Sequence, residues 1–185
     1  MKKYLKIIIY IVSFIIIILL AVLGYNFLTK NYSPEEINIE NNEYKLNKAK
    51  DFEVLNNKGE KVNLSDFFGK PIIVNFWATW CMPCKNELPE FNEAYKKYGK
   101  DIEFLMVNLT DGYNDTEDGV KQFVKENNYE FPLYFDTEYS ATYTYNIYSI
   151  PQTLFIDKNG NILKSYTGML NKQTLEKYIK NLKGE

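Results

Sequence analysis

Both cysteines of this chain, Cys81 and Cys84, stand in the stretch FWATWCMPCKNELPEF, directly after an apolar run. A pair at this spacing could bind a metal, form a structural disulfide, fill a core or carry redox chemistry. A tetrahedral zinc site needs four ligands, usually Cys or His, and the chain has neither a third Cys nor a His. A structural disulfide that closes so short a loop would constrain the unfolded chain only weakly. Redox chemistry accounts best for the placement, with the structural disulfide as its alternative.

The position of the pair between a strand and a helix favours redox chemistry. Cys81 falls where the end of a strand meets the start of a helix, and the unpaired N–H groups and the helix dipole there stabilise a thiolate. A lowered pKa of the Cys81 thiol would supply the attacking form near neutral pH. Cys84 lies one turn inside the helix, close enough to attack a mixed disulfide formed by Cys81 and so to release the reduced substrate.

Hydrophobic periodicity around the cysteines predicts alternating strands and helices. The run DFEVLNNKGEKVNLSDF has two alternating segments around Asn57–Gly59, which predicts a hairpin. The run IIVNFW after Pro71 predicts a strand buried on both faces, and a helical period follows from Pro83 to a stop at Gly99. The pattern also predicts strands at IEFLMVNL, PLYFD, TLFID and NILKSYTG, and helices at 116–128, 138–145 and 171–183. This order predicts an α/β domain with a central mixed sheet flanked by helices.

The N-terminal run Ile7–Thr29 contains no charged residue and is apolar on all sides. As a helix it would reach about 35 Å, enough to cross a hydrocarbon layer of about 30 Å. We therefore expect a single membrane-spanning anchor, for which a cleaved signal peptide is the alternative. Lys2, Lys3 and Lys6 precede the run and Lys30 alone follows it closely. The positive-inside rule then keeps the N-terminus in the cytoplasm and predicts that the rest of the chain lies outside it.

The composition of the chain indicates its domain organisation and excludes several kinds of partner and site. Residues 31–48 are polar with little apolar patterning, and we expect them to tether the anchor, residues 1–30, to one domain over 49–185. The formal net charge is −2, from 22 basic and 24 acidic residues, so the chain offers no basic field to nucleic acid. Every basic residue is Lys, which excludes sites built on an Arg fork or on imidazole. No metal or cofactor is expected.

The stretches WCMPC, VNFWAT and IPQTLFID resemble the thioredoxin superfamily, in particular the membrane-anchored TlpA-like or ResA-like thiol-disulfide oxidoreductases. The likeness runs from about residue 49 to the C-terminus and includes DFEVLNNKGEKVNLSDFFGK and VKQFVKENNYEFPLYFD. A CxxC alone is a weak signal, but Trp80, Pro83 and the SIPQT loop in the same order make it specific. The resemblance implies a thioredoxin-like fold with an N-terminal β-hairpin and a helix–strand insertion. It also implies the reduction of disulfides in client proteins outside the cytoplasm.

The resemblance assigns roles to individual residues. Pro151 would follow a cis peptide bond opposite the cysteines, the alternative being an ordinary trans proline, and Ile150 would present backbone groups to a substrate chain. Trp80 would pack beside the disulfide, the alternative being core filling. Glu87 lies three residues after Cys84, on the same helical face, where a partly desolvated carboxylate could exchange a proton with that thiol. The alternative for Glu87 is a solvated helix residue.

The sequence departs from thioredoxin at one position of the strand before the cysteines, and the resemblance also implies partners. Asn75 stands where thioredoxin has a buried aspartate, and because an amide cannot accept a proton in that role, proton transfer would fall to Glu87 or water. The implied partners are disulfide-containing clients, with apocytochrome c among the candidates, and a membrane electron donor of the CcdA/DsbD type. A thiol peroxidase of the peroxiredoxin type is an alternative, but it would need Thr-x-x-Cys with an Arg, and the chain has no Arg. A second alternative is a non-enzymatic client-binding module of thioredoxin fold.

Overall fold

The computed structural model describes residues 14, 16–20, 22–23, 25 and 47–184. Contacts within the chain divide it into two units, Met1–Lys45 and Leu46–Glu185. In the first unit the described residues are helical and exposed. The expected anchor lies mostly outside the described residues, as does the expected tether apart from Asn47 and Lys48. No helix formed by the described residues is both long and apolar enough to span a membrane.

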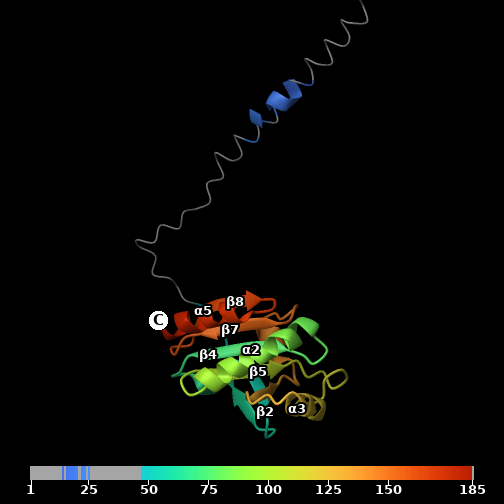
Figure 1. The fold of residues 1–185 in the computed structure, drawn as a ribbon, viewed down its shortest axis with the longest axis vertical. Helices are drawn as coiled ribbons and strands as arrows, with labels where there is room; N and C mark the ends of the chain where they lie inside the picture. Colours follow the sequence, from blue (N-terminus) through green and yellow to red (C-terminus); the bar gives the residue numbers. More distant parts are fainter. Residues whose placement is uncertain (1–13, 15, 21, 24, 26–46, 185) are drawn as a thin grey trace, which may run out of the picture. The chain divides into compact units, whose positions relative to one another are not determined.

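The second unit is built on one mixed sheet of eight strands (Figure 1). Its elements in chain order are β1 (Asn47–Lys48), β2 (Glu53–Asn56), β3 (Lys61–Asn63), the 3₁₀-helix η1 (Leu64–Phe67), β4 (Ile72–Trp77), α2 (Met82–Tyr98), β5 (Glu103–Asn108), α3 (Glu117–Glu126), β6 (Leu133–Phe135), α4 (Ser140–Thr144), β7 (Gln152–Ile156), β8 (Asn161–Thr167) and α5 (Lys172–Lys183). The strand order across the sheet is β1-β8-β7-β4-β5-β6-β2-β3. The pairs β4–β5 and β5–β6 are parallel and the others antiparallel. The predicted mixed sheet flanked by helices is therefore confirmed.

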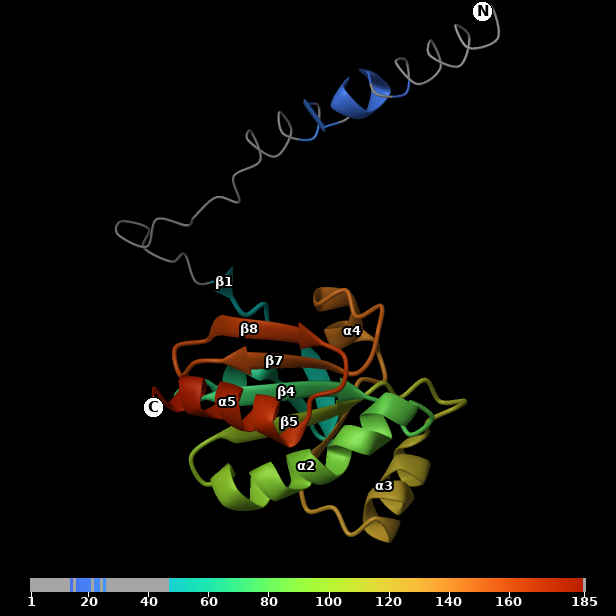
Figure 2. The same cartoon turned by 45° about the horizontal axis from the view of Figure 1, so that its top comes forward.

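The two faces of the sheet carry separate apolar clusters because side chains alternate along each strand. In β4, Ile73 and Trp77 belong to the cluster that also contains buried residues of α2, α3 and α5. Ile72, Val74 and Phe76 belong to the cluster on the other face, which includes the hairpin and α4. All six residues of β4 are buried, as its unbroken apolar run predicts. Figure 2 shows α2 and α5 side by side in front of the central strands.

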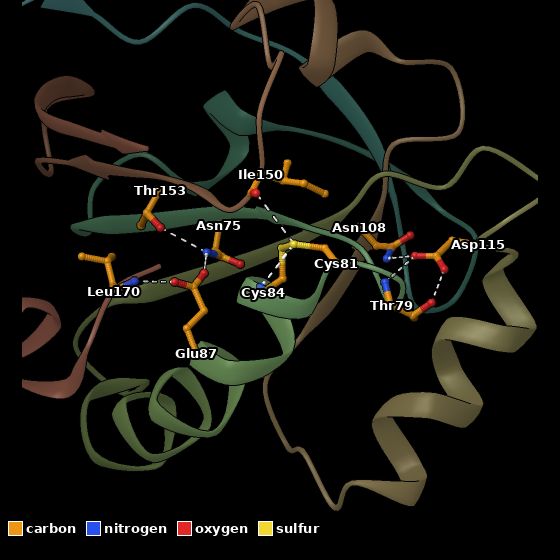
Figure 3. Close-up of a disulfide and its surroundings, with 10 residues drawn as sticks. All are labelled: Asn75, Thr79, Cys81, Cys84, Glu87, Asn108, Asp115, Ile150, Thr153 and Leu170. Atoms are coloured by element: carbon orange, nitrogen blue, oxygen red, sulfur yellow. Dashed lines mark hydrogen bonds between the residues drawn. A yellow bond between two sulfur atoms is a disulfide. The ribbon is translucent and has the colours of Figure 1, made fainter. Parts of the chain in front are cut away.

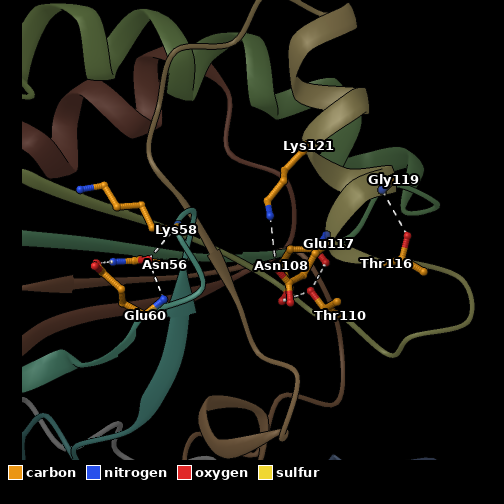
Figure 4. A network of polar contacts seen from close by, with 9 residues as sticks. All are labelled: Asn56, Lys58, Glu60, Asn108, Thr110, Thr116, Glu117, Gly119 and Lys121. Carbon is orange, nitrogen blue, oxygen red and sulfur yellow. Dashed lines mark hydrogen bonds and ion pairs between the residues drawn. The ribbon is translucent and has the colours of Figure 1, made fainter.

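The predicted hairpin joins β2 to β3 in an antiparallel pair. The Oδ1 atom of Asn56 accepts hydrogen bonds from the backbone N–H groups of Lys58 at 2.9 Å and Glu60 at 3.0 Å, which hold the turn (Figure 4). Gly59 has a φ of 79°, a left-handed conformation that glycine adopts without steric cost. Local sequence therefore determines this turn.

The first strand begins inside the predicted tether. The polar composition of Asn47 and Lys48 assigns them to that tether, but they form β1 and pair antiparallel with β8. The backbone N–H of Ala49 continues the contact by donating to the carbonyl of Gly160 at 2.8 Å. These are backbone hydrogen bonds, so the polar side chains of the segment carry no signal for them.

Each of the three long helices begins at a residue that caps it. Cys81 caps α2, with its side chain accepting from the first turn of the helix. The hydroxyl of Thr116 accepts from the N–H of Gly119 at 3.2 Å at the start of α3 (Figure 4). Asn171 accepts from the N–H of Thr174 at 2.9 Å at the start of α5. These caps satisfy backbone donors that a helix start leaves unpaired, and the helices begin within one residue of the predicted starts at 83, 116 and 171.

Candidate functional site

Cys81 and Cys84 form a disulfide between the end of β4 and the first turn of α2 (Figure 3). Their sulfur atoms are 2.05 Å apart and their Cα atoms 5.2 Å apart. Cys81 is 5 % exposed, whereas Cys84 is fully buried, so an incoming thiolate or disulfide meets Cys81 first. The backbone N–H of Cys84 points at Sγ of Cys81 from 3.2 Å. The same N–H would stabilise a thiolate on Cys81 in the reduced protein.

The Ile150–Pro151 segment lies against the disulfide. Its peptide bond is cis, as the resemblance implied. The carbonyl oxygen of Ile150 lies 3.7 Å from Sγ of Cys81 (Figure 3). Ile150 is half-buried and Pro151 is buried. A substrate chain that binds along Ile150 would therefore bring its own sulfur close to Cys81.

Large apolar side chains that lie near Cys81 or near the cis peptide bond in sequence are exposed. Trp80 is 57 % exposed and Met82 is 63 % exposed, and the two residues flank Cys81. Tyr148, which precedes the cis peptide bond, is 90 % exposed. The core-filling alternative for Trp80 is therefore wrong, and Trp77, with no exposed surface, fills the core instead. Exposed aromatic and thioether side chains at this place offer apolar surface to a protein ligand.

Glu87 is fully buried, one turn along α2 from Cys84, so the alternative of a solvated helix residue is wrong. Its Oε1 atom accepts a hydrogen bond from Nδ2 of Asn75 at 2.8 Å, and its Oε2 atom accepts one from the backbone N–H of Leu170 at 2.6 Å. Burial raises the pKa of Glu87 to about 7, although both hydrogen bonds favour the charged form. A carboxyl group with this pKa can accept a proton and return it near neutral pH.

Asn75 connects Glu87 to the neighbouring strand. It stands opposite Thr153 in the antiparallel pairing of β4 with β7. Its Nδ2 atom donates to Oγ1 of Thr153 at 3.1 Å as well as to Glu87 (Figure 3). Its Oδ1 atom is buried and has no hydrogen-bond partner among the described residues. The sequence marks Asn75 only as the residue in place of an aspartate, and it gives no signal for the contact with Glu87.

A second buried polar cluster holds the loop that leads to Cys81. The Oδ2 atom of Asp115 accepts hydrogen bonds from the backbone N–H of Thr79 at 2.8 Å and from Nδ2 of Asn108 at 2.7 Å (Figure 3). Its Oδ1 atom accepts from the hydroxyl of Thr79, and the hydroxyl of Thr110 donates to Oδ1 of Asn108 at 2.8 Å (Figure 4). Sequence reasoning missed Asp115, because nothing in its spacing from the cysteines indicates this contact.

The groups that contact Cys81 are the second sulfur, on Cys84, and the backbone carbonyl of Ile150, and the buried carboxyl group of Glu87 lies one turn along α2 from Cys84. In the part of the chain that the structure describes, no group of three or more His, Cys, Asp or Glu residues could hold a metal ion. A pair of cysteine sulfurs can exchange disulfide bonds with another protein, and a carboxyl group whose pKa is near neutral can take up or return a proton that such an exchange moves.

Several known proteins are similar to this chain. Residues 46–165 match the AhpC/TSA family. A relative, the thiol-disulfide oxidoreductase ResA of Bacillus cereus, is 34% identical over 91% of this chain and 92% of that protein. A solved structure of a putative thiol:disulfide interchange protein DsbE from Chlorobium tepidum is 30% identical, with a TM-score of 0.65 over 74% of this chain and 95% of that one. An exposed lipoprotein thioredoxin from Streptococcus pneumoniae is 32% identical, with a TM-score of 0.62 over 72% of this chain and 100% of that one.

Proposed function

Because the chain belongs to the AhpC/TSA family and is a ResA-like thiol-disulfide oxidoreductase, we propose that it reduces disulfide bonds in client proteins outside the cytoplasm. The observation that carries this proposal is the contact between the Cys81–Cys84 disulfide and the Ile150–Pro151 segment. Cys81 has exposed surface and Cys84 has none, which supports attack on the client by Cys81 and resolution of the mixed disulfide by Cys84.

In the proposed reaction, the Cys81 thiolate attacks one sulfur of a client disulfide. A bond forms between Cys81 and that sulfur, and the second client sulfur leaves as a thiolate that takes up a proton from water. Cys84 then gives its proton to the Glu87 carboxylate and attacks Sγ of Cys81. The Cys81–Cys84 disulfide forms and the first client sulfur leaves, so that two electrons have passed from the pair to the client. Burial of Glu87 next to this helix turn supports its role as the proton acceptor.

Trp80, Ile150 and Pro151 are the proposed client-binding residues. The exposed ring of Trp80 offers apolar surface to side chains that flank the client cysteine. The backbone of Ile150 offers hydrogen-bonding groups beside Cys81, as an extended substrate chain requires. An unfolded or partly folded client suits this surface because its own apolar side chains are exposed.

The proposed location and electron supply follow from the N-terminal segment. We infer that the run Ile7–Thr29 anchors the chain and that residues 49–185 form a catalytic domain outside the cytoplasm, because Lys2, Lys3 and Lys6 precede that run. The similar pneumococcal thioredoxin is an exposed lipoprotein. A disulfide formed outside the cytoplasm needs electrons from across the membrane, so the proposed donor is a membrane protein of the CcdA/DsbD type. Apocytochrome c is one candidate client.

Reduction of insulin by the full-length protein in detergent tests the activity. With dithiothreitol as the electron source, the wild-type protein is expected to accelerate the precipitation of the insulin B chain, and Cys81→Ser is expected to return the rate to the uncatalysed one. Full activity in Cys81→Ser would exclude this pair as the reducing group. Capture of unfolded insulin chains by the wild-type protein without any reduction would instead support the binding-module alternative.

A further inference from the structure

The hydrogen bonds around Glu87 are arranged for a carboxylate. Both of its oxygen atoms face N–H donors, the side-chain amide of Asn75 and the backbone N–H of Leu170. An ionised carboxyl group only accepts hydrogen bonds, so it suits both donors. The carbonyl end of the Asn75 amide, in contrast, makes no hydrogen bond with any described residue.

A protonated Glu87 does not suit the same arrangement. The N–H of Leu170 belongs to the backbone and cannot exchange its donor for an acceptor, so it continues to need Oε2 as an acceptor. The acidic proton must then sit on Oε1, which lies 2.8 Å from Nδ2 of Asn75. Two donors would then face each other at that distance, so the carboxyl O–H would have no acceptor and Nδ2 of Asn75 would keep only its bond to Thr153.

We propose that the side-chain amide of Asn75 turns over, exchanging its nitrogen and oxygen positions, when Glu87 takes up a proton. Turned over, Oδ1 of Asn75 accepts from the Glu87 carboxyl O–H and from the Thr153 hydroxyl. Thr153 can serve both orientations because a hydroxyl both donates and accepts. In either orientation one end of the amide makes two hydrogen bonds and the other makes none, so the number of bonds is unchanged.

The groups that make hydrogen bonds with Glu87 and Asn75 carry no charge: Asn75 of β4, Thr153 of β7 and the backbone of Leu170 before α5. On α2 the titratable groups one turn before and one turn after Glu87 are the thiol of Cys84 in the reduced protein and the half-buried carboxyl group of Glu90. No charged side chain among the described residues contributes to the raised pKa of Glu87, which has burial as its cause. The carboxyl group is thus held by hydrogen bonds in both of its protonation states.

The inference rests on the proposed role of Glu87 in proton transfer and assigns Asn75 as its positioning residue. When Glu87 accepts the proton of Cys84, the amide turns and keeps the carboxyl group in place. When the proton leaves, the amide turns back. The acid can therefore take up and return a proton without moving its backbone or losing a hydrogen bond.

Nuclear magnetic resonance of the oxidised full-length chain, labelled with ¹⁵N at asparagine and ¹³C at glutamate in detergent micelles, tests this proposal. The pH is varied from about 5 to about 9, which brackets the pKa of Glu87 at about 7. The side-chain amide signals of Asn75 are expected to shift with the same midpoint as the carboxyl carbon of Glu87. No client is present, so the result is independent of whether the protein reduces insulin.

Glu87→Gln provides the matched variant. Its amide offers a carbonyl to the N–H of Leu170 and N–H donors to Asn75, which imitates the protonated acid at every pH. The Asn75 signals of this variant are expected to stay at the low-pH position of the wild type across the whole range. Asn92 is the internal control, because its Oδ1 atom is held by the N–H of Glu130 at 2.7 Å and its signals should not change.

Two results would overturn the proposal. One is a set of wild-type Asn75 signals that stays in place while the Glu87 carboxyl carbon titrates. The other is a Glu87→Gln protein whose Asn75 signals match the high-pH position of the wild type while Asn92 is unchanged. The wild-type titration decides the matter by itself if Glu87→Gln does not fold.

Discussion

Asp115 holds Thr79 by two hydrogen bonds, one from the backbone N–H and one from the hydroxyl, although 36 residues separate the two in the chain. Thr79 stands directly before Trp80 and Cys81. Asp115 is 2 % exposed and also accepts a hydrogen bond from Asn108. The loop that leads to Cys81 is therefore held by a residue in the loop before a different helix, α3.

Asp115→Ala is expected to lower the free energy of unfolding by about 3 kcal/mol, because the buried N–H of Thr79 and the amide of Asn108 lose a charged acceptor. The rate of insulin reduction should fall as well, since the loop before Cys81 loses the hydrogen bonds that hold Thr79. Urea unfolding followed by tryptophan fluorescence gives the first quantity. Asp118→Ala, an exposed position three residues further on, is the control and should change stability by less than about 0.5 kcal/mol. Equal effects of the two substitutions would contradict this account.

The fold could be predicted to a large extent because its signals are local. The unbroken apolar run of β4 indicates burial on both faces, and the turn residues Asn57–Gly59 indicate a hairpin. The CxxC after the apolar run indicates a strand end that leads into a helix, and the structure confirms that junction, with Cys81 at the start of α2. Spacing along one helix likewise put Glu87 on the same face as Cys84. In each case the evidence lies within a few residues of the feature that it predicts.

The contacts between distant segments could not be predicted in this way. Asn75 meets Thr153 because of the register between β4 and β7, and that register depends on the pairing of whole strands. Asp115 contacts Thr79 because the loop before α3 lies beside the end of β4. The hydrophobic periodicity of the sequence does not indicate that contact. The pairing of Asn47 with β8 also relies on backbone groups, which every sequence has.

Glu87 should make stability depend on pH. Burial raises its pKa from 4.5 to about 7, so the folded protein holds this proton more tightly than the unfolded chain does. Its contribution is fully present below about pH 4.5 and is lost as the pH rises through about 7, a fall of about 3 kcal/mol. Glu87→Gln should abolish this fall because an amide does not ionise in this range. Urea unfolding at a series of pH values measures it.

The exposed Glu93→Gln on the same helix is the control and should keep the wild-type pH dependence. If Glu87→Gln also keeps it, Glu87 does not carry the linked proton. A second readout concerns catalysis: Glu87→Gln should slow disulfide exchange and shift the pH dependence of thiol reactivity while the protein stays folded. Unchanged rates and thiol titration would remove Glu87 from the proposed proton transfer.

Trp80 and Trp77 should respond differently to truncation. Trp80 is 57 % exposed, so Trp80→Ala should change the free energy of unfolding by less than about 0.5 kcal/mol. It should raise the KM for insulin and leave the reduction of a small disulfide, such as oxidised glutathione, unchanged. Trp77 has no exposed surface, so Trp77→Ala should cost about 3 to 5 kcal/mol of stability. An unchanged KM in folded Trp80→Ala would remove Trp80 from the client-binding surface.

The proposed topology rests on Lys2, Lys3 and Lys6 against Lys30. Protease added to intact cells from which the outer layers have been removed is expected to digest the catalytic domain. A cytoplasmic marker protein in the same cells should remain intact, which shows that the membrane is closed. Digestion of the domain only after lysis would reverse the proposed orientation.

The proposed roles, attack by Cys81 and release of the client by Cys84, predict which cysteine variant traps a client. Cys84→Ser should leave Cys81 joined to its substrate, because the internal thiol that releases the substrate is gone. Mixed disulfides should therefore accumulate on this variant. Cys81→Ser should trap far less, since Cys84 is fully buried and lies inside the helix. Non-reducing electrophoresis of the two variants, expressed to equal levels, measures the difference.

Mass spectrometry of the Cys84→Ser adducts would then identify the clients. A haem-protein precursor among them would indicate a role in cytochrome maturation, whereas a broad set of proteins would indicate general disulfide reduction. Equal trapping by the two variants would contradict the assignment of attack to Cys81. If neither variant traps a protein while the wild type still reduces insulin, the exchange model fails for physiological clients, and the binding-module alternative gains support.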